Sequence, residues 1–280
     1  MSGFKTRFWT ALLFVVIMLC GITINEYSFL LLFGVINFLC IWEFFGLVLG
    51  KNLKESLFRN LVALFMGISP FFFSGALQLG WVPNDPDFLM IVFIVYIVFF
   101  YLTFVIELFN TSTHALQFLA YVVLGIIYIG GSFSILNSFA FVNGQYLYYL
   151  VLGPVLFTWI NDTAAYLVGS KFGKTPLFPR ISPKKSWEGT FGAALITLIM
   201  AYPISLLMPQ LSYSTWLGMA TVIFITGGIG DLVESMFKRS INIKDSSGLL
   251  PGHGGFLDRF DAFIFSVPFV AAYLFLTDII

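Results

Sequence analysis

The stretch FLMIVFIVYIVFFYLTFVIEL, residues 88–108, carries a single charged side chain, Glu107, and about 20 such residues span a bilayer as an α-helix. Eight more apolar stretches of similar length occur along the chain, at about residues 8–24, 28–49, 61–81, 115–136, 146–169, 189–208, 215–235 and 261–278. The whole chain is 59% hydrophobic, with a mean hydropathy of +0.95. These features predict an all-α polytopic membrane protein with about nine transmembrane helices.

The placement of the basic residues predicts the orientation of the spans. With nine crossings, all fourteen Lys and Arg residues fall on the side of the N-terminus, and the loops of the other side contain none. Cytoplasmic loops of membrane proteins carry such an excess of positive charge, so we expect a cytoplasmic N-terminus and a C-terminus outside. The short termini favour a bacterial plasma (inner) membrane. The net charge of zero gives no bulk attraction to nucleic acid.

Composition divides the chain into two regions. Residues 1–145 contain about five transmembrane helices, whereas residues 146–280 contain the remaining spans and two long loops on the basic side, 170–188 and 236–260. Loop 170–188 holds three prolines and five cations, so we expect an irregular backbone there. We expect the chemistry of the protein in the C-terminal region, on the cytoplasmic face.

The end of span 215–235 gathers polar residues on one face of the predicted helix. Asp231, Glu234, Ser235 and Lys238 are spaced three, four and seven apart, which brings them to the same side. Glu234 and Lys238 could form an ordinary ion pair at a helix end. Asp231 lies deeper, after three glycines that allow a close approach, and an intramembrane carboxylate indicates function.

A second acidic pair opens the last span. Asp258 and Asp261 lie one helical turn apart, just after the glycine turn GHGG at residues 252–255. Either aspartate alone could be explained as an N-terminal cap, since acids favour that end of a helix. Arg259 between them and the glycine turn before them favour a site for phosphates and Mg²⁺, because the turn leaves backbone N–H groups free. His253 could be an acid or base, a phosphate donor or only a turn residue.

Asn161 and Asp162 form a third constellation, inside span 146–169. Polar residues at such a depth face a polar cavity or make hydrogen bonds between helices. Lys184 and Lys185 in the following loop could reach phosphate groups, or they could simply reflect the charge bias of that side.

Other ionisable residues give weaker signals. Glu43 and Glu107 are lone acids near span ends, and we expect them to be structural. The chain has only two histidines and two cysteines, which offer no ligand set for zinc.

These clusters together resemble the signature of CDP-diacylglycerol synthases, also called phosphatidate cytidylyltransferases. The signature is filled here by Ser235, Lys238, Arg239, Lys244, Asp245, Pro251, His253, Gly254, Gly255, Asp258, Arg259 and Asp261. Two further blocks agree with the family, NDTAAY at residues 161–166 and ISPKKSWEG at residues 181–189. The resemblance is tight over residues 155–262 and only compositional before them.

The resemblance implies a polytopic, homodimeric enzyme that condenses CTP with phosphatidic acid into CDP-diacylglycerol and pyrophosphate for phospholipid synthesis. It also implies a requirement for Mg²⁺, alone or with a second cation. The catalytic residues would be Asp231, Asp258, Asp261, Lys238 and Arg239, with the three aspartates holding the metal. The substrate-binding residues would be Asn161, Asp162, Lys184, Lys185, Ser235, Lys244, Asp245, His253, Gly254, Gly255 and Arg259.

Two other functions compete with this one. A related CTP-dependent transferase would act on another lipid phosphate or on a polyprenol, and its preference would depend on apolar grooves that a sequence does not reveal. An ion-coupled membrane transporter would use the intramembrane acids as a coupling-ion site. Transporters of that kind commonly contain paired repeats, and no repeat is visible here. We therefore expect cytidylyl transfer.

Overall fold

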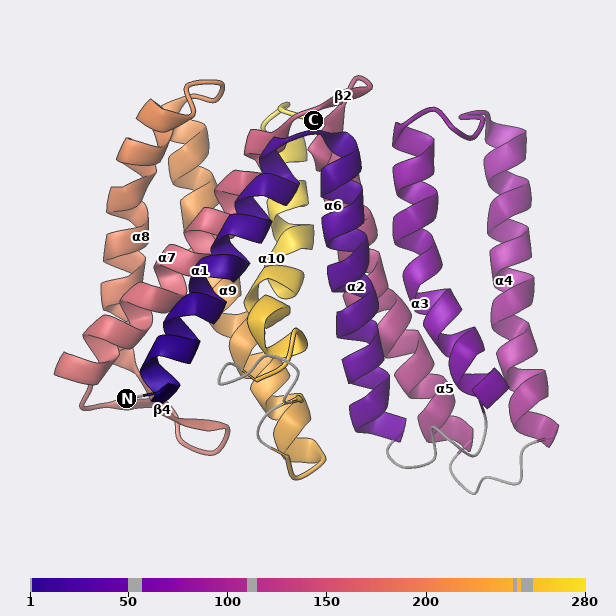
Figure 1. Cartoon of the computed structure of the whole chain (residues 1–280), viewed down its shortest axis with the longest axis horizontal. Helices are drawn as coiled ribbons and strands as arrows, with labels where there is room; N and C mark the ends of the chain where they lie inside the picture. Colours follow the sequence, from indigo (N-terminus) through magenta and orange to yellow (C-terminus); the bar gives the residue numbers. More distant parts are fainter. Residues whose placement is uncertain (1, 50–56, 110–114, 244–245, 248–253) are drawn as a thin grey trace.

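The computed structural model describes residues 2–49, 57–109, 115–243, 246–247 and 254–280 (Figure 1). The helices of the N-terminal region are α1 (Ser2–Thr23), α2 (Glu26–Leu49), α3 (Leu57–Gln78), α4 (Pro86–Phe109), α5 (Ala115–Leu124), the π-helical segment η2 (Gly125–Gly131) and α6 (Ser132–Ala140). Those of the C-terminal region are α7 (Tyr148–Phe172), α8 (Trp187–Leu207), α9 (Tyr213–Ser240) and α10 (Leu257–Leu276).

The helices confirm the predicted class of an all-α polytopic membrane protein. Eight helical runs in the described residues are long and apolar enough to cross a membrane, with α5, η2 and α6 forming one continuous run. The described apolar part of α1, Trp9–Thr23, is shorter. The nine predicted spans correspond to these eight runs and α1.

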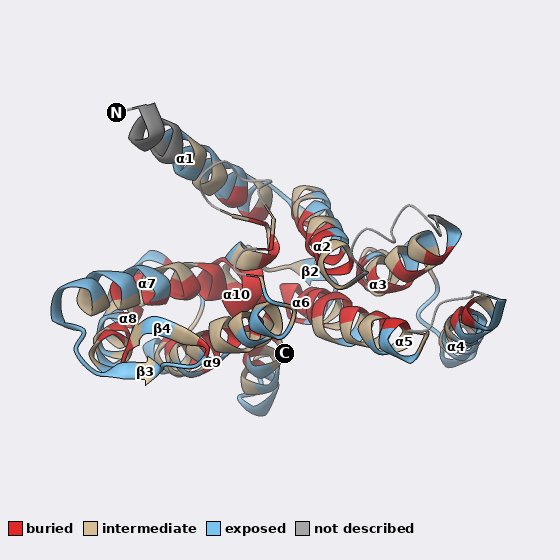
Figure 2. Ribbon diagram, turned by 90° about the horizontal axis from the view of Figure 1, so that it is seen from below, coloured by how far each residue is buried: buried red, intermediate tan, exposed pale blue. Residues whose placement is uncertain are grey.

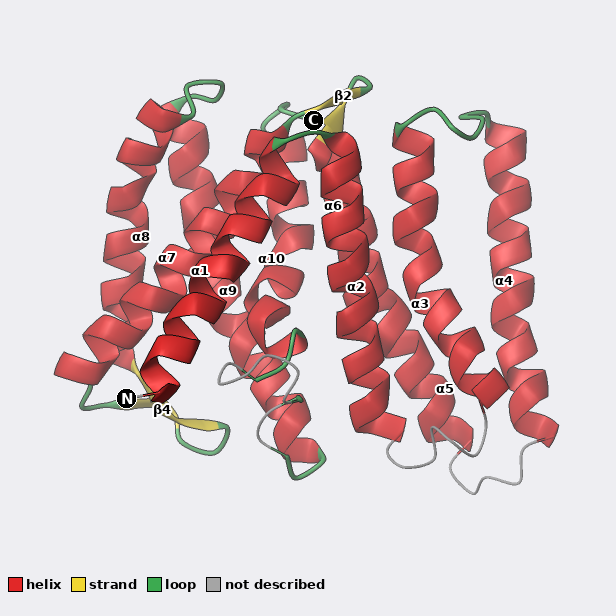
Figure 3. Ribbon diagram, in the orientation of Figure 1, coloured by secondary structure: helices red, strands yellow, loops and turns green. Residues whose placement is uncertain are grey.

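Two short hairpins accompany the helices, at opposite ends of the bundle (Figure 3). β1 (Phe141–Val142) pairs with β2 (Gln145–Tyr146), and β3 (Pro176–Phe178) pairs with β4 (Ser182–Ser186), both antiparallel. The expectation of an irregular backbone in residues 170–188 is therefore wrong. Each strand of a two-stranded hairpin has an unpaired edge, where a proline, which lacks an N–H group, is tolerated.

The termini also lie at opposite ends of the bundle (Figure 1). The end with the N-terminus also carries β4, and we call it the basic end, because Lys171, Lys174, Lys184 and Lys185 belong to the segment around the β3–β4 hairpin. The other end carries the C-terminus and the β1–β2 hairpin.

Helix α10 lies in the middle of the bundle, where the two regions meet (Figure 2). It packs against α9 and α7 of the C-terminal region and against α6 and α2 of the N-terminal region. By contrast, α4 lies at the outer edge, and only two of its residues, Thr103 and Glu107, are buried. Lipid tails are as apolar as its side chains, so α4 needs no protein cover. The start of α10 is therefore a point that both regions can reach.

Two glycines let α3 and η2 approach each other closely. A Cβ atom added to Gly130 would collide with the carbonyl oxygen of Gly67. A Cβ atom added to the adjacent Gly131 would meet only the carbonyl oxygen of Ile126, at 3.5 Å. Small residues commonly allow such contact between helices in membranes.

We expect Gly130→Ala to destabilise the protein by about 1–3 kcal/mol, the usual cost of overpacking. Gly131→Ala is the matched control, because its methyl group has room and alanine favours a helix over glycine by up to about 1 kcal/mol. Thermal unfolding of both variants in detergent micelles measures the difference. Equal unfolding midpoints would contradict the close contact between α3 and η2.

Candidate active site

Helices α7, α9 and α10 converge at the glycines of α9. A Cβ atom on Gly230 would lie 2.6 Å from the Cβ of Phe265 and 3.1 Å from the carbonyl oxygen of Asp261, so only glycine allows α10 this close. A Cβ atom on Gly227 would lie 3.7 Å from Nδ2 of Asn161, which is buried on α7. The glycines thus bring polar residues of three helices together.

Acidic side chains gather at this junction. The charge of Asp261 on α10 is repelled by those of Asp231 and Glu234 on α9 and of Asp162 on α7. Asp261 is buried, and its Oδ1 accepts a hydrogen bond from the N–H of Ala262 at 2.7 Å. The structure thus brings Asp231 and Asp261, two of the three predicted metal ligands, near Asp162, a predicted substrate-binding residue.

Lys185 reaches this cluster from the β3–β4 hairpin. Its Nζ lies 2.6 Å from Oδ2 of Asp231, and both side chains remain partly exposed. The other oxygen of the same carboxylate, Oδ1, accepts a hydrogen bond from Oγ of Ser235 at 3.3 Å. The charge of Asp162 is attracted to Lys185 and to Arg259, which is exposed on α10. The cluster thus combines acids with cations that solvent or a ligand can reach.

Lys238 forms a second, more buried node. Its Nζ lies 2.5 Å from Oε2 of Glu234 and 2.8 Å from Oδ1 of Asp258. The helical ion pair between Glu234 and Lys238 that the sequence allowed is therefore present. Asp258 is further held by the backbone, because its Oδ2 accepts the N–H groups of Ser246 at 3.0 Å and Gly255 at 2.9 Å.

Arg239 and the hairpin fix the basic end of α9. The Nε of Arg239 donates to the carbonyl oxygen of Ile181 at 3.4 Å, and its Nη1 donates to that of Ile243 at 3.0 Å. The carboxylate of Glu188, at the start of α8, accepts two backbone N–H groups from the segment before β3. These bonds hold the hairpin so that Lys185 points at α9.

Other predicted site residues are placed less tightly. Lys184 is exposed on β4, Gly254 and Gly255 lie just before α10, and Gly255 is buried. The predicted residues Lys244, Asp245 and His253 lie outside the described residues. Their roles stay predictions.

Glu43 on α2 adjoins this site, and it has partners in the segment before α10, whereas the sequence prediction left it as a lone structural acid. Its carboxylate accepts hydrogen bonds from the hydroxyls of Ser246 and Ser247 and from the N–H groups of Phe256 and Leu257. A carboxylate in an apolar span needs partners, and this rule could have indicated from the sequence that Glu43 has them. Glu107, the other lone acid, pairs instead with Arg59 at 2.5 Å.

The donor chemistry of the cluster fits a divalent cation in part. Within the described ranges, no three His, Cys, Asp or Glu side chains are arranged to hold one metal ion, and the carboxylate of Asp258 points at Lys238. The predicted trio of metal ligands is therefore not gathered as a preformed set. Asp231 and Asp261 remain suitable, because Mg²⁺ commonly takes one or two carboxylates and completes its shell with water and substrate phosphates.

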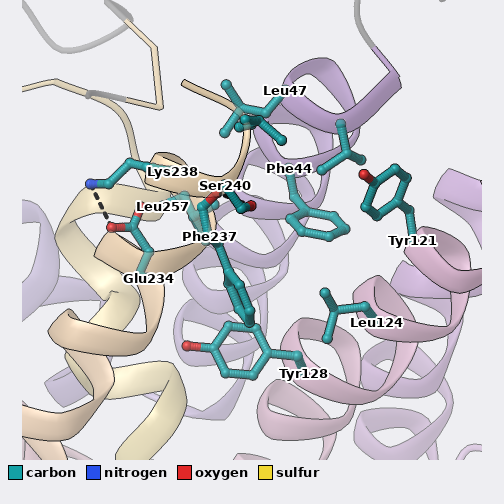
Figure 4. A pocket seen from close by; sticks show the side chains of 12 residues that line it. Phe44, Leu47, Tyr121, Leu124, Tyr128, Glu234, Phe237, Lys238, Ser240 and Leu257 are labelled. Atoms are coloured by element: carbon teal, nitrogen blue, oxygen red, sulfur yellow. Dashed lines mark hydrogen bonds and ion pairs between the residues drawn. The ribbon is translucent and has the colours of Figure 1, made fainter. Parts of the chain in front are cut away.

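A small apolar pocket, partly open to solvent, adjoins the Lys238 node (Figure 4). Figure 4 shows the Lys238–Glu234 pair on one wall and the side chains of Tyr121 and Leu124 on the opposite wall. The remaining lining residues are Phe44, Leu47, Val48, Tyr128, Phe237, Ser240, Ile241 and Leu257. The pocket thus lies between the N-terminal region and α9, with a charged group at its edge.

The fold and the site define a multi-pass membrane protein with a cluster of acids and lysines where three helices converge. The chain matches the cytidylyltransferase family over residues 5–277, and it belongs to that family.

Its relatives include phosphatidate cytidylyltransferases of three bacteria. The chain is 40% identical to that of Staphylococcus aureus (strain COL) over 152 residues, which are 53% of this chain and 56% of the relative. It is 39% identical to that of Bacillus subtilis (strain 168) over 171 residues, 60% of this chain and 62% of the relative. It is 40% identical to that of Staphylococcus epidermidis (strain ATCC 12228) over 144 residues, 48% of this chain and 55% of the relative. The chain thus spans little more than half the length of the relatives it matches.

We expect Lys238→Met to destabilise the protein by about 3–5 kcal/mol, because the buried carboxylates of Glu234 and Asp258 lose the cation that they share. Lys184→Met is the matched control, since Lys184 is exposed and surface changes usually stay within about 0.5 kcal/mol. Adding Glu234→Gln to Lys238→Met should restore part of the loss. Unfolding midpoints in detergent measure all three, and a Lys238→Met protein as stable as the control would disprove the buried node.

Proposed function

We propose that this protein is a CTP:phosphatidate cytidylyltransferase that converts CTP and phosphatidic acid into CDP-diacylglycerol and pyrophosphate. The observation that carries the proposal is membership of the cytidylyltransferase family over nearly the whole chain. Relatives at about 40% identity are named phosphatidate cytidylyltransferase. The junction of α7, α9 and α10 supplies the acids and lysines that such a phosphate reaction needs.

The proposed reaction is an in-line displacement at phosphorus. An oxygen of the phosphatidic acid phosphate attacks the α-phosphorus of CTP and forms a new P–O bond. The bond from the α-phosphorus to the oxygen that bridges to the β-phosphate breaks, and pyrophosphate leaves with the electron pair. The attacking oxygen is already anionic, so no strong base is needed, and the protein acts by positioning and by neutralising charge.

The lysines and acids divide this work. In our proposal Lys185 exchanges its bond to Asp231 for a bond to the polyphosphate of CTP, and the exposed Lys184 assists the departing pyrophosphate. Asp231 and Asp261 would hold Mg²⁺, with Asp162 beside them. The bound ion would supply positive charge against the phosphoryl oxygens. Asn161 would contact the nucleotide. Lys238 would hold Asp258, and with it the start of α10, in place against α9.

We further propose that the basic end faces the cytoplasm in a bacterial plasma membrane. The concentration of Lys and Arg at that end supports this orientation. CTP would then reach the site from water, and phosphatidic acid would reach it from the inner leaflet. The homodimer implied by the family resemblance is part of the same proposal.

The apolar pocket beside Lys238 suits a short segment of one acyl chain of the lipid substrate. Its lining is mostly aliphatic and aromatic, and burial of an acyl chain contributes about 0.8 kcal/mol per CH₂ group. The pocket is lined by residues near the ends of α2 and α9, at the basic end, where a lipid phosphate would lie.

We expect Asp231→Asn to lower cytidylyl transfer by about 10²–10³-fold, the scale for removing one group that stabilises transition-state charge. The measurement is transfer of the cytidylyl group from cytidine-labelled CTP to lipid, in mixed micelles with phosphatidic acid and Mg²⁺. Asp87→Asn is the matched control, because Asp87 is exposed in the first turn of α4. Near-normal activity of Asp231→Asn would remove Asp231 from the mechanism, and an inactive wild-type protein would overturn the proposed reaction.

We expect Leu124→Trp to fill the pocket and to raise KM for long-chain phosphatidic acid more than KM for a short-chain form. Leu116→Trp on the same helix is the matched control, because Leu116 is 81% exposed and points away from the protein. Both variants are compared with the wild type at saturating CTP. An unchanged preference in Leu124→Trp would exclude this pocket as the acyl site.

A further inference from the structure

Glu43 makes an unusual set of contacts for an acid near the end of an apolar helix. It is 4% exposed and lies on α2, in the N-terminal region. Its Oε1 accepts hydrogen bonds from Oγ of Ser247 at 2.7 Å and from the N–H of Phe256 at 2.9 Å. Its Oε2 accepts them from Oγ of Ser246 at 3.0 Å and from the N–H of Leu257 at 2.9 Å. Both oxygens are therefore fully engaged with the segment that leads into α10.

Two of these bonds cap α10 from another helix. The first N–H groups of any α-helix have no partner within the helix, and a negative charge near them is favourable. Phe256 and Leu257 supply such N–H groups at the start of α10, and no side chain of Phe256 caps them. Glu43 therefore caps the N-terminus of α10. In most helices a Ser or Asp close by in the sequence fills this role.

The glycines before α10 are required by the same arrangement. A Cβ atom on Gly255 would collide with Oγ of Ser246 and with Oε2 of Glu43. Gly254 has a φ of +81°, and a Cβ atom there would lie 2.7 Å from Oδ2 of Asp258. The turn thus passes between two carboxylates, Glu43 on one side and Asp258 on the other.

The position of Asp258 follows from this turn. Asp258 accepts hydrogen bonds from the N–H groups of Ser246 and Gly255. Ser246 also bonds to Glu43, and Gly255 directly precedes the residues that Glu43 caps. Asp258 also forms an ion pair with Lys238. Asp261 lies one helical turn further along α10, inside the acid cluster. A shift at the start of α10 would therefore move both aspartates relative to α9.

We propose that Glu43 is a positioning residue, which fixes the turn before α10 so that Asp258 and Asp261 face α9 in the geometry that the reaction needs. This inference rests on the proposed cytidylyl transfer. The hydrogen bonds of Glu43 go to Ser246, Ser247, Phe256 and Leu257, so its effect on the acid cluster would be transmitted by the turn and by α10.

Glu43→Gln is a sharp test, because an amide cannot replace both carboxylate oxygens. Whichever way the amide is turned, its NH₂ group faces either the N–H of Phe256 or that of Leu257. The hydroxyls of Ser246 and Ser247 can rotate to accept a bond, whereas a backbone N–H cannot. The variant keeps the size of the side chain and loses one capping bond.

We expect Glu43→Gln to lower kcat by up to about 100-fold, the loss typical of a misplacement of about 1 Å. KM for CTP should change little, because Lys184 and Lys185 are untouched. Glu43→Asp keeps the charge and should recover part of kcat. Amide hydrogen exchange, followed by mass spectrometry on peptides that contain Phe256 and Leu257, should become faster in Glu43→Gln.

Glu107→Gln is the matched control, because Glu107 is a buried acid of the same region that contacts Arg59 and lies outside the site. It should leave kcat and the exchange of Phe256 and Leu257 unchanged. Equal loss of kcat in the Glu43→Gln and Glu107→Gln proteins would overturn the proposal, as would a kcat of Glu43→Gln within twofold of the wild type. If the wild type transfers no cytidylyl group, the proposed function fails, and unchanged exchange in Glu43→Gln would separately refute the capping role.

Discussion

Charge inside an apolar bundle must be paired, and this constraint arranges the basic end of the protein. An unpaired ion in such surroundings costs several kcal/mol, and the buried acids Glu43, Glu107 and Glu234 each contact a cation or a set of N–H groups. Lys238 sits between two acids, and Lys185 is drawn from a hairpin to Asp231. The same requirement joins Glu43 to the start of α10, which links the two regions of the chain.

Much of the fold could be predicted because apolar length is a local property of the sequence. The predicted span 88–108 lies inside α4, Pro86–Phe109, and the other spans agree to within a few residues. The β3–β4 hairpin was missed because prolines were taken to exclude regular structure. A proline destabilises a strand only where its missing N–H group would have bonded to a neighbouring strand. Whether that edge is free depends on how the strands pair, and the residue type alone does not reveal it.

The site could be predicted where helical periodicity links its residues. Asp231, Glu234, Ser235 and Lys238 lie within two turns of one helix, and the contacts among them follow from that spacing. Glu43 could not be matched with its partners, because they lie 203 to 214 positions later in the chain and no local period connects them. Asp231 was assigned a function because an intramembrane carboxylate indicates one. Glu43 was placed near a span end, so the same argument was not applied to it.

The distance along the chain between Glu43 and its partners has a consequence for the order of synthesis. At about 5–20 residues per second, roughly 10–40 s pass between the translation of α2 and that of the turn before α10. Throughout that interval the carboxylate exists without the four donors that it meets in the finished protein. The acid on α2 therefore enters the membrane before its partners exist. Helix α10, made more than 200 residues later, supplies two of them when its first turn forms.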